Sequence, residues 1–87
     1  MEYRLQFKAS VKRDLKRFDK PTAKKILDET ENELVSDPTK GKELSGEFQG
    51  LFSHRMGNYR VIYSIIRDSV LVLRIAHRGE VYRKKIT

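Results

Sequence analysis

The chain has 87 residues, and its 19 Lys and Arg against 12 Asp and Glu give a formal net charge of +7. A chain of this length has room for one small core, so we expect a single domain over residues 1–87. Because the sequence has no Cys, disulfide-rich scaffolds are excluded. Two His do not complete a tetrahedral zinc site, so we expect no metal ion and no cofactor.

The positive charge is concentrated in the second half of the sequence. Residues 1–49 contain 11 basic and 10 acidic side chains, whereas residues 50–87 contain 8 basic and 2 acidic ones. This asymmetry indicates a negatively charged partner, nucleic acid first and a membrane surface second. No apolar run approaches the roughly 20 residues of a membrane-spanning helix, and no signal peptide is visible, so we expect a cytoplasmic protein outside the membrane.

The first half of the chain predicts one strand followed by two helices. Apolar and polar residues alternate over residues 3–8, which favours an edge or half-buried strand. Ser10 is the expected N-cap of a short basic helix, and Asp19 is the expected N-cap of a longer, mostly acidic one. Asp37-Pro38 ends the second helix, because the residue before Pro disfavours the helical conformation. The two helices are expected to form a hairpin that covers a sheet.

The second half predicts a loop and an antiparallel meander. Residues 40–50 are expected to be a loop anchored by Leu44 and Phe48. Strands are expected over residues 51–56, 59–66 and 70–76, with tight turns at Gly57-Asn58 and at residues 67–69. The order β-α-α-β-β-β predicts a single two-layer α+β domain, in which a helical hairpin packs on a mainly antiparallel four-stranded sheet.

The candidate site is a set of basic and aromatic residues on this meander and the tail. Alternation along residues 59–66 places Arg60 on the side of the sheet that the helices leave uncovered. Arg binds phosphate oxygens through two parallel hydrogen bonds. RNA carries its own nucleophile, the 2′-hydroxyl, so its cleavage needs positioning, charge stabilisation and proton transfer. Arg60 and Arg78 are candidates for charge stabilisation, and Tyr82 or His77 for proton transfer.

Each of these residues also has a purely structural interpretation. An Arg at the start of a strand is often a solvated residue, and Tyr59 and Tyr63 are expected to be packing residues. The set as a whole is a stronger candidate site than any one of its residues, because residues 55–60 and 77–85 are expected to reach one face of the sheet. The expected substrate-binding residues are Arg55, His77, Arg83, Lys84 and Lys85.

Two segments carry a resemblance to a known family. G-N-Y-R-V-I-Y at residues 57–63 and H-R-G-E-V-Y-R at residues 77–83 resemble the RelE/ParE superfamily of toxins from type II toxin–antitoxin systems. Residues 44–46, L-S-G, resemble the L-x-G loop of that family, and the resemblance covers essentially the whole chain. It implies a toxin that forms a hetero-oligomer with a cognate antitoxin.

The superfamily implies two activities. RelE-like members cut mRNA in the ribosomal A site without a metal ion and so inhibit translation, whereas ParE-like members poison DNA gyrase. In the RelE-like scheme, Arg60 stabilises the transition state, Arg78 supports it, and Tyr82 stacks on or deprotonates the nucleotide. Arg55 matches a further basic position. Because Arg60, Arg78 and Tyr82 are all present, we favour the RelE-like endoribonuclease, acting with ribosome and mRNA.

The chain departs from the RelE-type pattern at two places. Ser53 stands where a basic residue is expected, which leaves the general base open. The spacing between Arg78 and Tyr82 is shorter than in the enteric-type sequence, so His77 is expected to share the work. The alternatives are a non-catalytic inhibitor of gyrase and a nucleic-acid-binding module without catalysis.

Overall fold

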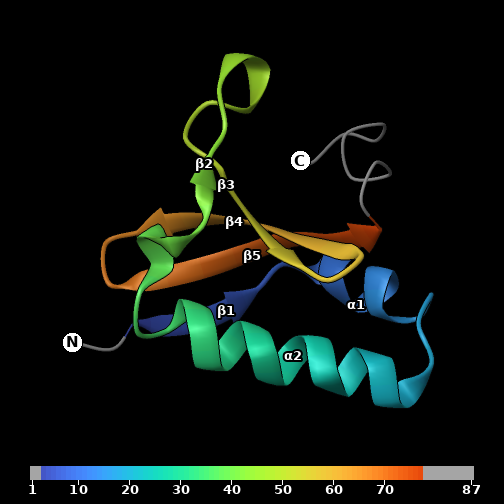
Figure 1. Ribbon diagram of the computed structural model, residues 1–87. Coiled ribbons are helices and arrows are strands. Elements are labelled where there is room, and N and C mark those ends of the chain that lie inside the picture. The colour runs from blue at the N-terminus through green and yellow to red at the C-terminus, as the bar shows by residue number, and fades with distance from the viewer. Residues whose placement is uncertain (1–2, 78–87) are drawn as a thin grey trace.

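A computed structural model describes residues 3–77, which form one five-stranded sheet with two helices (Figure 1). None of the helices in this part of the chain is long and apolar enough to cross a membrane. The elements in chain order are β1 (Arg4–Phe7), α1 (Ala9–Leu15), α2 (Lys20–Leu34), the 3₁₀ turn η1 (Pro38–Lys40), β2 (Lys42–Glu43), the 3₁₀ turn η2 (Gly46–Phe48), β3 (Phe52–Met56), β4 (Tyr59–Ile66) and β5 (Ser69–His77).

The sheet is mixed but mainly antiparallel. Its strand order is β1-β5-β4-β3-β2, in which β1 runs parallel to β5 and the other pairs are antiparallel. The predicted α+β class is therefore confirmed. The sheet has five strands rather than four, because part of the expected loop pairs with β3 as β2. The backbone N–H of Leu44 donates to the carbonyl of Leu51 at 2.8 Å and closes this short hairpin.

Helix α2 covers one face of the sheet (Figure 1). Its buried residues, Ile26, Thr30 and Leu34, are four positions apart and lie on one side of the helix. Val61 and Tyr63 of β4 are fully buried in the same cluster, as alternation along that strand predicts. The main core therefore lies between α2 and the sheet.

Helix α1 completes the edge of β5. Strand β1 pairs only with the first half of β5. Beyond it, the Ser10 hydroxyl donates to the carbonyl of Leu73 at 2.8 Å, and the Asp14 carboxylate accepts from the N–H of Ile75 at 3.0 Å. Ser10 is therefore not the N-cap as predicted. The N-cap is Lys8, and the Ser10 hydroxyl instead bonds a strand carbonyl that would lack a partner.

Tyr63 ties the sheet to the segment that follows α2. Its buried hydroxyl donates to the carbonyl of Pro38 at 2.5 Å and accepts from the N–H of Gly41 at 3.1 Å. Its ring stacks on Phe52 at a centroid distance of 5.5 Å. Burial raises the pKa of the Tyr63 phenol, so the hydroxyl keeps its proton and remains a donor.

A polar contact links the last turn of α2 to β3. Nε2 of His54, on the α2 side of the sheet, contacts Oε2 of Glu33. This hydrogen bond is the main cause that lowers the pKa of the Glu33 carboxyl below its ordinary value of 4.5. The contact therefore favours the ionised carboxylate in the folded protein.

Candidate functional site

Three arginines on adjacent strands share the sheet face that lies opposite α2. Arg55 of β3 is paired directly with Arg60 of β4, and Arg74 of β5 is paired with Ile62, two residues along β4 from Arg60. Paired residues project to the same side of an antiparallel sheet, and diagonal neighbours lie roughly 7–8 Å apart. Arg55, Arg60 and Arg74 therefore form one group, and we call this side of the sheet the arginine face.

A β-bulge brings Arg74 to the arginine face. Tyr63 pairs with Val72 and Ile62 pairs with Arg74, so that Leu73 is an extra residue in β5. Val72 is buried in the main core on the α2 side. With strict alternation Arg74 would project into that core as well. The extra residue shifts the alternation by one position and turns Arg74 to the other face.

The Asp14 carboxylate of α1 fixes the direction of Arg74. Its two oxygens accept from Nε and Nη2 of Arg74, both at 2.8 Å, and the side chains of Asp14 and Arg74 are only 5% and 13% exposed. The hydrogen bond raises the pKa of the Arg74 guanidinium. Asp14 is not among the site residues predicted from the sequence. Its burial was predictable, because Asp14 follows Val11 by three residues and so lies on the same side of α1.

Arg60, the candidate catalytic residue, is half-buried in β4. Its Nη1 donates to the hydroxyl of Ser53 at 3.2 Å, and Ser53 is itself buried, with 4% exposure. Ser53 pairs with Ile62 and so lies on the arginine face as well. Ser53, which stands where the RelE-type pattern has a basic residue, is therefore in direct contact with Arg60.

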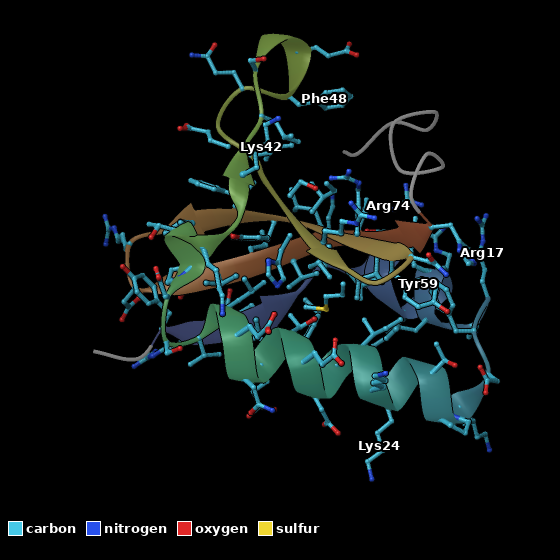
Figure 2. The ribbon with its side chains drawn as sticks, in the orientation of Figure 1. Arg17, Lys24, Lys42, Phe48, Tyr59 and Arg74 are labelled. Atoms are coloured by element: carbon cyan, nitrogen blue, oxygen red, sulfur yellow. The ribbon has the colours of Figure 1, made fainter. Side chains whose placement is uncertain are left out.

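The arginine face is not fully open. Leu44, Phe48 and Leu51 pack on it against Ile62, Leu73 and Ala76, a second apolar cluster on the side away from α2. The segment around η2 rises from the sheet on that side (Figure 1). Figure 2 shows Phe48 on this segment and Arg74 on the same side of the sheet. Leu44 and Phe48 therefore anchor this segment as predicted. They also cover part of the sheet face that strand alternation alone predicts to be uncovered.

His77 lies away from the arginine face. It is exposed at the end of β5 and pairs with Tyr59, whose ring is on the α2 side. The His77 ring centroid is 5.0 Å from that of Tyr59 and 5.5 Å from that of Phe18. The structure therefore does not bring His77 to Arg60. The remaining predicted site residues lie outside the described residues and stay predictions: Arg78, Tyr82, Arg83, Lys84 and Lys85.

A proton acceptor is the component that the described part of the face lacks. Over β3, β4 and β5, the positions that face away from α2 carry no His or Tyr. The Asp14 carboxylate is already engaged by Arg74 and by the backbone of Ile75. Within residues 3–77, no three His, Asp or Glu side chains are grouped so as to hold a metal ion. Over the described residues, these positions of the arginine face therefore offer positive charge but no His or Tyr side chain.

Comparison with known proteins identifies the family. A family model described as the ParE toxin of type II toxin–antitoxin systems, parDE, matches residues 5–82. The chain belongs to the RelE/ParE toxin family. Toxin RelG of Mycobacterium tuberculosis is 32% identical to it over 87 residues, which covers 97% of this chain and 100% of that toxin. The resemblance seen in the sequence is therefore confirmed.

Solved structures of RelE/ParE toxins have the same fold. A crystal structure of a toxin–antitoxin complex from M. tuberculosis contains a chain that superimposes with a TM-score of 0.85 at 30% identity, over 91% of this chain and 94% of that one. The archaeal RelE–RelB complex from Pyrococcus horikoshii gives a TM-score of 0.69 at 27% identity, over 91% and 98% of the two chains. Both structures are complexes of a toxin with its antitoxin.

Proposed function

We propose that this RelE/ParE-family toxin is a ribosome-dependent endoribonuclease that cleaves mRNA in the A site and so stops translation. The observation that carries the proposal is the position of Arg60 on the arginine face, between Arg55 on one neighbouring strand and Arg74 on the other. The guanidinium groups of Arg55 and Arg60, side by side on adjacent strands, bind neighbouring phosphates better than a single guanidinium does. This activity places the toxin in the cytoplasm.

The chemistry follows from the group that RNA supplies. The 2′-oxygen attacks the adjacent phosphorus, the P–O2′ bond forms and the P–O5′ bond breaks, which leaves a cyclic phosphate and a 5′-hydroxyl. Arg60 stabilises the negative charge that develops on the phosphoryl oxygens, held in direction by the Ser53 hydroxyl. Arg55, which is exposed, binds a flanking phosphate, whereas Arg74 is held by the Asp14 carboxylate beside the site. Removing one such donor typically costs a factor of about 10²–10³ in rate.

Proton transfer is assigned to the C-terminal residues. Tyr82, as its phenolate, takes the proton from the 2′-hydroxyl, and water supplies the proton that the departing 5′-oxygen needs. Arg78 adds a second positive charge at the phosphate. His77 is a weaker candidate, because its ring packs with Tyr59 on the α2 side of the sheet. These assignments rest on the sequence pattern at residues 77–83, and replacing Tyr82 with Phe tests them through the pH profile of cleavage.

The second candidate function is inhibition of DNA gyrase without catalysis, which the match to the ParE family model favours. Two assays on one preparation separate the functions. Cleavage ends are mapped on mRNA bound to programmed ribosomes, and supercoiling by gyrase is measured beside them. The endoribonuclease predicts new ends in the A-site codon and unchanged supercoiling. Inhibited supercoiling with intact mRNA would instead establish the gyrase inhibitor.

A cognate antitoxin is the proposed partner. The related M. tuberculosis and P. horikoshii toxins have been crystallised with their antitoxins. Seven net positive charges on this chain favour an acidic or amphipathic antitoxin segment. We place that segment over the arginine face, where it blocks access to Arg60. Loss of cleavage on adding the protein encoded beside this toxin, in a stable complex, tests the assignment.

A further inference from the structure

Stability alone does not explain the buried charge pair of Asp14 and Arg74. Taking two charges out of water is costly, and replacing a buried ion pair by apolar residues of similar size is often neutral or stabilising. The Asp14 side chain is only 5% exposed, and its carboxylate accepts two hydrogen bonds at 2.8 Å from the Arg74 guanidinium. A second effect of this carboxylate lies on the arginine face.

Helix α1 holds the β-bulge of β5 on both sides. The Ser10 hydroxyl donates to the carbonyl of Leu73, the extra residue of the bulge, at 2.8 Å. The N–H of Ile75, two residues along the strand, donates to the Asp14 carboxylate at 3.0 Å. Arg74 lies between these two points of contact. Helix α1 therefore fixes both the backbone of the bulge and the guanidinium that projects from it.

Arg74 is a close neighbour of Arg60, the candidate catalytic residue. Ser53, Ile62 and Arg74 form one row across β3, β4 and β5, and Arg60 lies in the next row of the same face. The diagonal neighbours of Arg60 are therefore Ser53 on one strand and Arg74 on the other, each roughly 7–8 Å away. Nη1 of Arg60 donates to the Ser53 hydroxyl at 3.2 Å. A charge on Arg74 without a counter-ion would act on this half-buried guanidinium at short range, where salt screens little.

Asp14 supplies a negative charge that the strands of the arginine face lack. Over the described residues, the positions of β3, β4 and β5 that face away from α2 carry no Asp or Glu. Arg74 and the Asp14 carboxylate together are neutral, so these three strands present the net charge of Arg55 and Arg60. Without that carboxylate, Arg74 would be a third unbalanced cation. It would compete with Arg60 for the same phosphate and repel the Arg60 guanidinium.

We propose that Asp14 is a positioning residue of the cleavage site, which cancels the charge of Arg74 so that Arg60 meets the scissile phosphate without a competing cation. The inference rests on the proposed function, because it takes Arg60 as the group that stabilises the transition state. It goes beyond a structural role, because RNA affinity and cleavage rate then respond in opposite directions to the loss of the carboxylate. A third cation strengthens the binding of RNA, whereas a misdirected Arg60 slows the reaction.

The test compares Asp14→Asn, Arg74→Gln, the double variant D14N/R74Q and Ser10→Ala with the wild-type toxin. Asn has the shape of Asp and keeps an oxygen that accepts the N–H of Ile75, so Asp14→Asn removes the charge with little change of shape. The double variant is neutral at both positions. Ser10→Ala is the matched control, because it removes another hydrogen bond between α1 and β5 and changes no charge.

Two quantities are measured for each folded variant. The affinity for a single-stranded RNA of about ten nucleotides is titrated over a range of salt concentrations, after correction for the folded fraction of the protein. The rate constant of cleavage is measured in single turnover on programmed ribosomes that are saturated with folded toxin. At saturation this rate constant does not depend on the folded fraction, so a loss of stability alone leaves it unchanged.

The charge variants should shift RNA affinity in opposite directions. We expect Asp14→Asn to bind RNA about two- to fivefold more tightly at low salt and to cleave about tenfold more slowly. Arg74→Gln should bind RNA about two- to fivefold more weakly, because the carboxylate is then unbalanced. The double variant should return both quantities to within about threefold of the wild-type values, and Ser10→Ala should change each by less than about twofold.

Weaker or unchanged RNA binding by Asp14→Asn would overturn the inference, as would an equal loss of rate in Ser10→Ala or a double variant no faster than Asp14→Asn. If Asp14→Asn does not fold, the other two charge variants decide the matter. Weaker RNA binding by Arg74→Gln that the double variant reverses supports the inference, and its persistence contradicts it. Wild-type toxin that cuts no mRNA contradicts the endoribonuclease, whereas opposite shifts in RNA affinity would still support the charge balance between Asp14 and Arg74.

Discussion

Arg55 and Arg60 face each other directly across the β3–β4 hairpin, two positive charges at one register position. Directly opposite side chains in an antiparallel pair have their Cβ atoms roughly 4.5–5.5 Å apart, and like charges there destabilise the sheet. Arg55 is exposed, and its Nε makes a long contact of 3.4 Å with the carbonyl oxygen of Gly57. We infer that this pairing lowers the stability of the hairpin and concentrates positive charge at one position of the sheet.

Replacing Arg55 with Gln should therefore stabilise the fold. We expect the free energy of unfolding to rise by about 0.2–1 kcal/mol at low ionic strength, because the repulsion from Arg60 is removed. The gain should shrink in 0.5 M salt, where exposed charges are screened. Urea unfolding at both salt concentrations measures it, with Lys42→Gln as the control on the neighbouring strand. A destabilised Arg55→Gln protein would refute the account of the hairpin.

The pair of Asp14 and Arg74 should behave as a buried unit. Asp14→Asn leaves the Arg74 guanidinium buried without its counter-charge, and we expect a loss of about 3–5 kcal/mol in unfolding free energy. The double variant D14N/R74Q should lose less than the sum of the two single variants, because neither charge is left alone. Additive losses in a urea-unfolding cycle would show that the pair contributes nothing beyond its separate residues.

The Tyr63 hydroxyl and Gly41 should be energetically coupled. Tyr63→Phe leaves the Pro38 carbonyl and the Gly41 N–H without their partner, which should cost about 1–3 kcal/mol. Gly41→Ala should also destabilise, because a Cβ atom there would overlap Oη of Tyr63 and lie 3.1 Å from the carbonyl oxygen of Ser53. In the Tyr63→Phe protein the Ala substitution should cost less. An equal loss of unfolding free energy from Gly41→Ala in the wild-type and Tyr63→Phe proteins would contradict the contact between Gly41 and the Tyr63 hydroxyl.

The contact between Glu33 and His54 should make stability depend on acid pH. The folded-state pKa of Glu33 is lowered from 4.5, so the unfolded chain binds more protons in that range. The stabilisation is therefore fully present above about pH 4.5 and is lost as the pH falls through the folded-state pKa. The free energy of unfolding of Glu33→Gln should lie furthest below that of the wild-type protein at neutral pH and should approach it near pH 3. Glu31→Gln, at an exposed position, is the matched control.

Periodicity alone predicts most of the fold. The alternation of β4 identifies its core face correctly, and Gly57 directly follows the last residue of β3. Helix α2 ends at Leu34, earlier than the predicted end at Asp37-Pro38. The short strand β2 was not predictable in this way, because its two exposed residues have no alternation to recognise. Ser10 was misassigned because a hydroxyl in a first helical turn also serves a distant strand, as the bond to Leu73 shows.

The candidate site was predictable only in part. Arg60 follows from strand alternation, but the position of Arg74 depends on a β-bulge that no local pattern marks. Asp14 and Arg74 are 60 residues apart in the sequence, so their contact exists only once α1 docks on β5.

The most direct test of the central claim is the rate at which Arg60 variants cleave mRNA on programmed ribosomes. Single-turnover cleavage by Arg60→Ala is compared with the wild-type toxin and with Arg60→Lys, and circular dichroism and urea unfolding verify that each variant is folded. We expect Arg60→Ala to lose a factor of about 10²–10³ in rate. Arg60→Lys should lose less, because Lys keeps the positive charge and lacks only the two-pronged donor of Arg. A folded Arg60→Ala protein that cleaves at the wild-type rate would contradict the assignment.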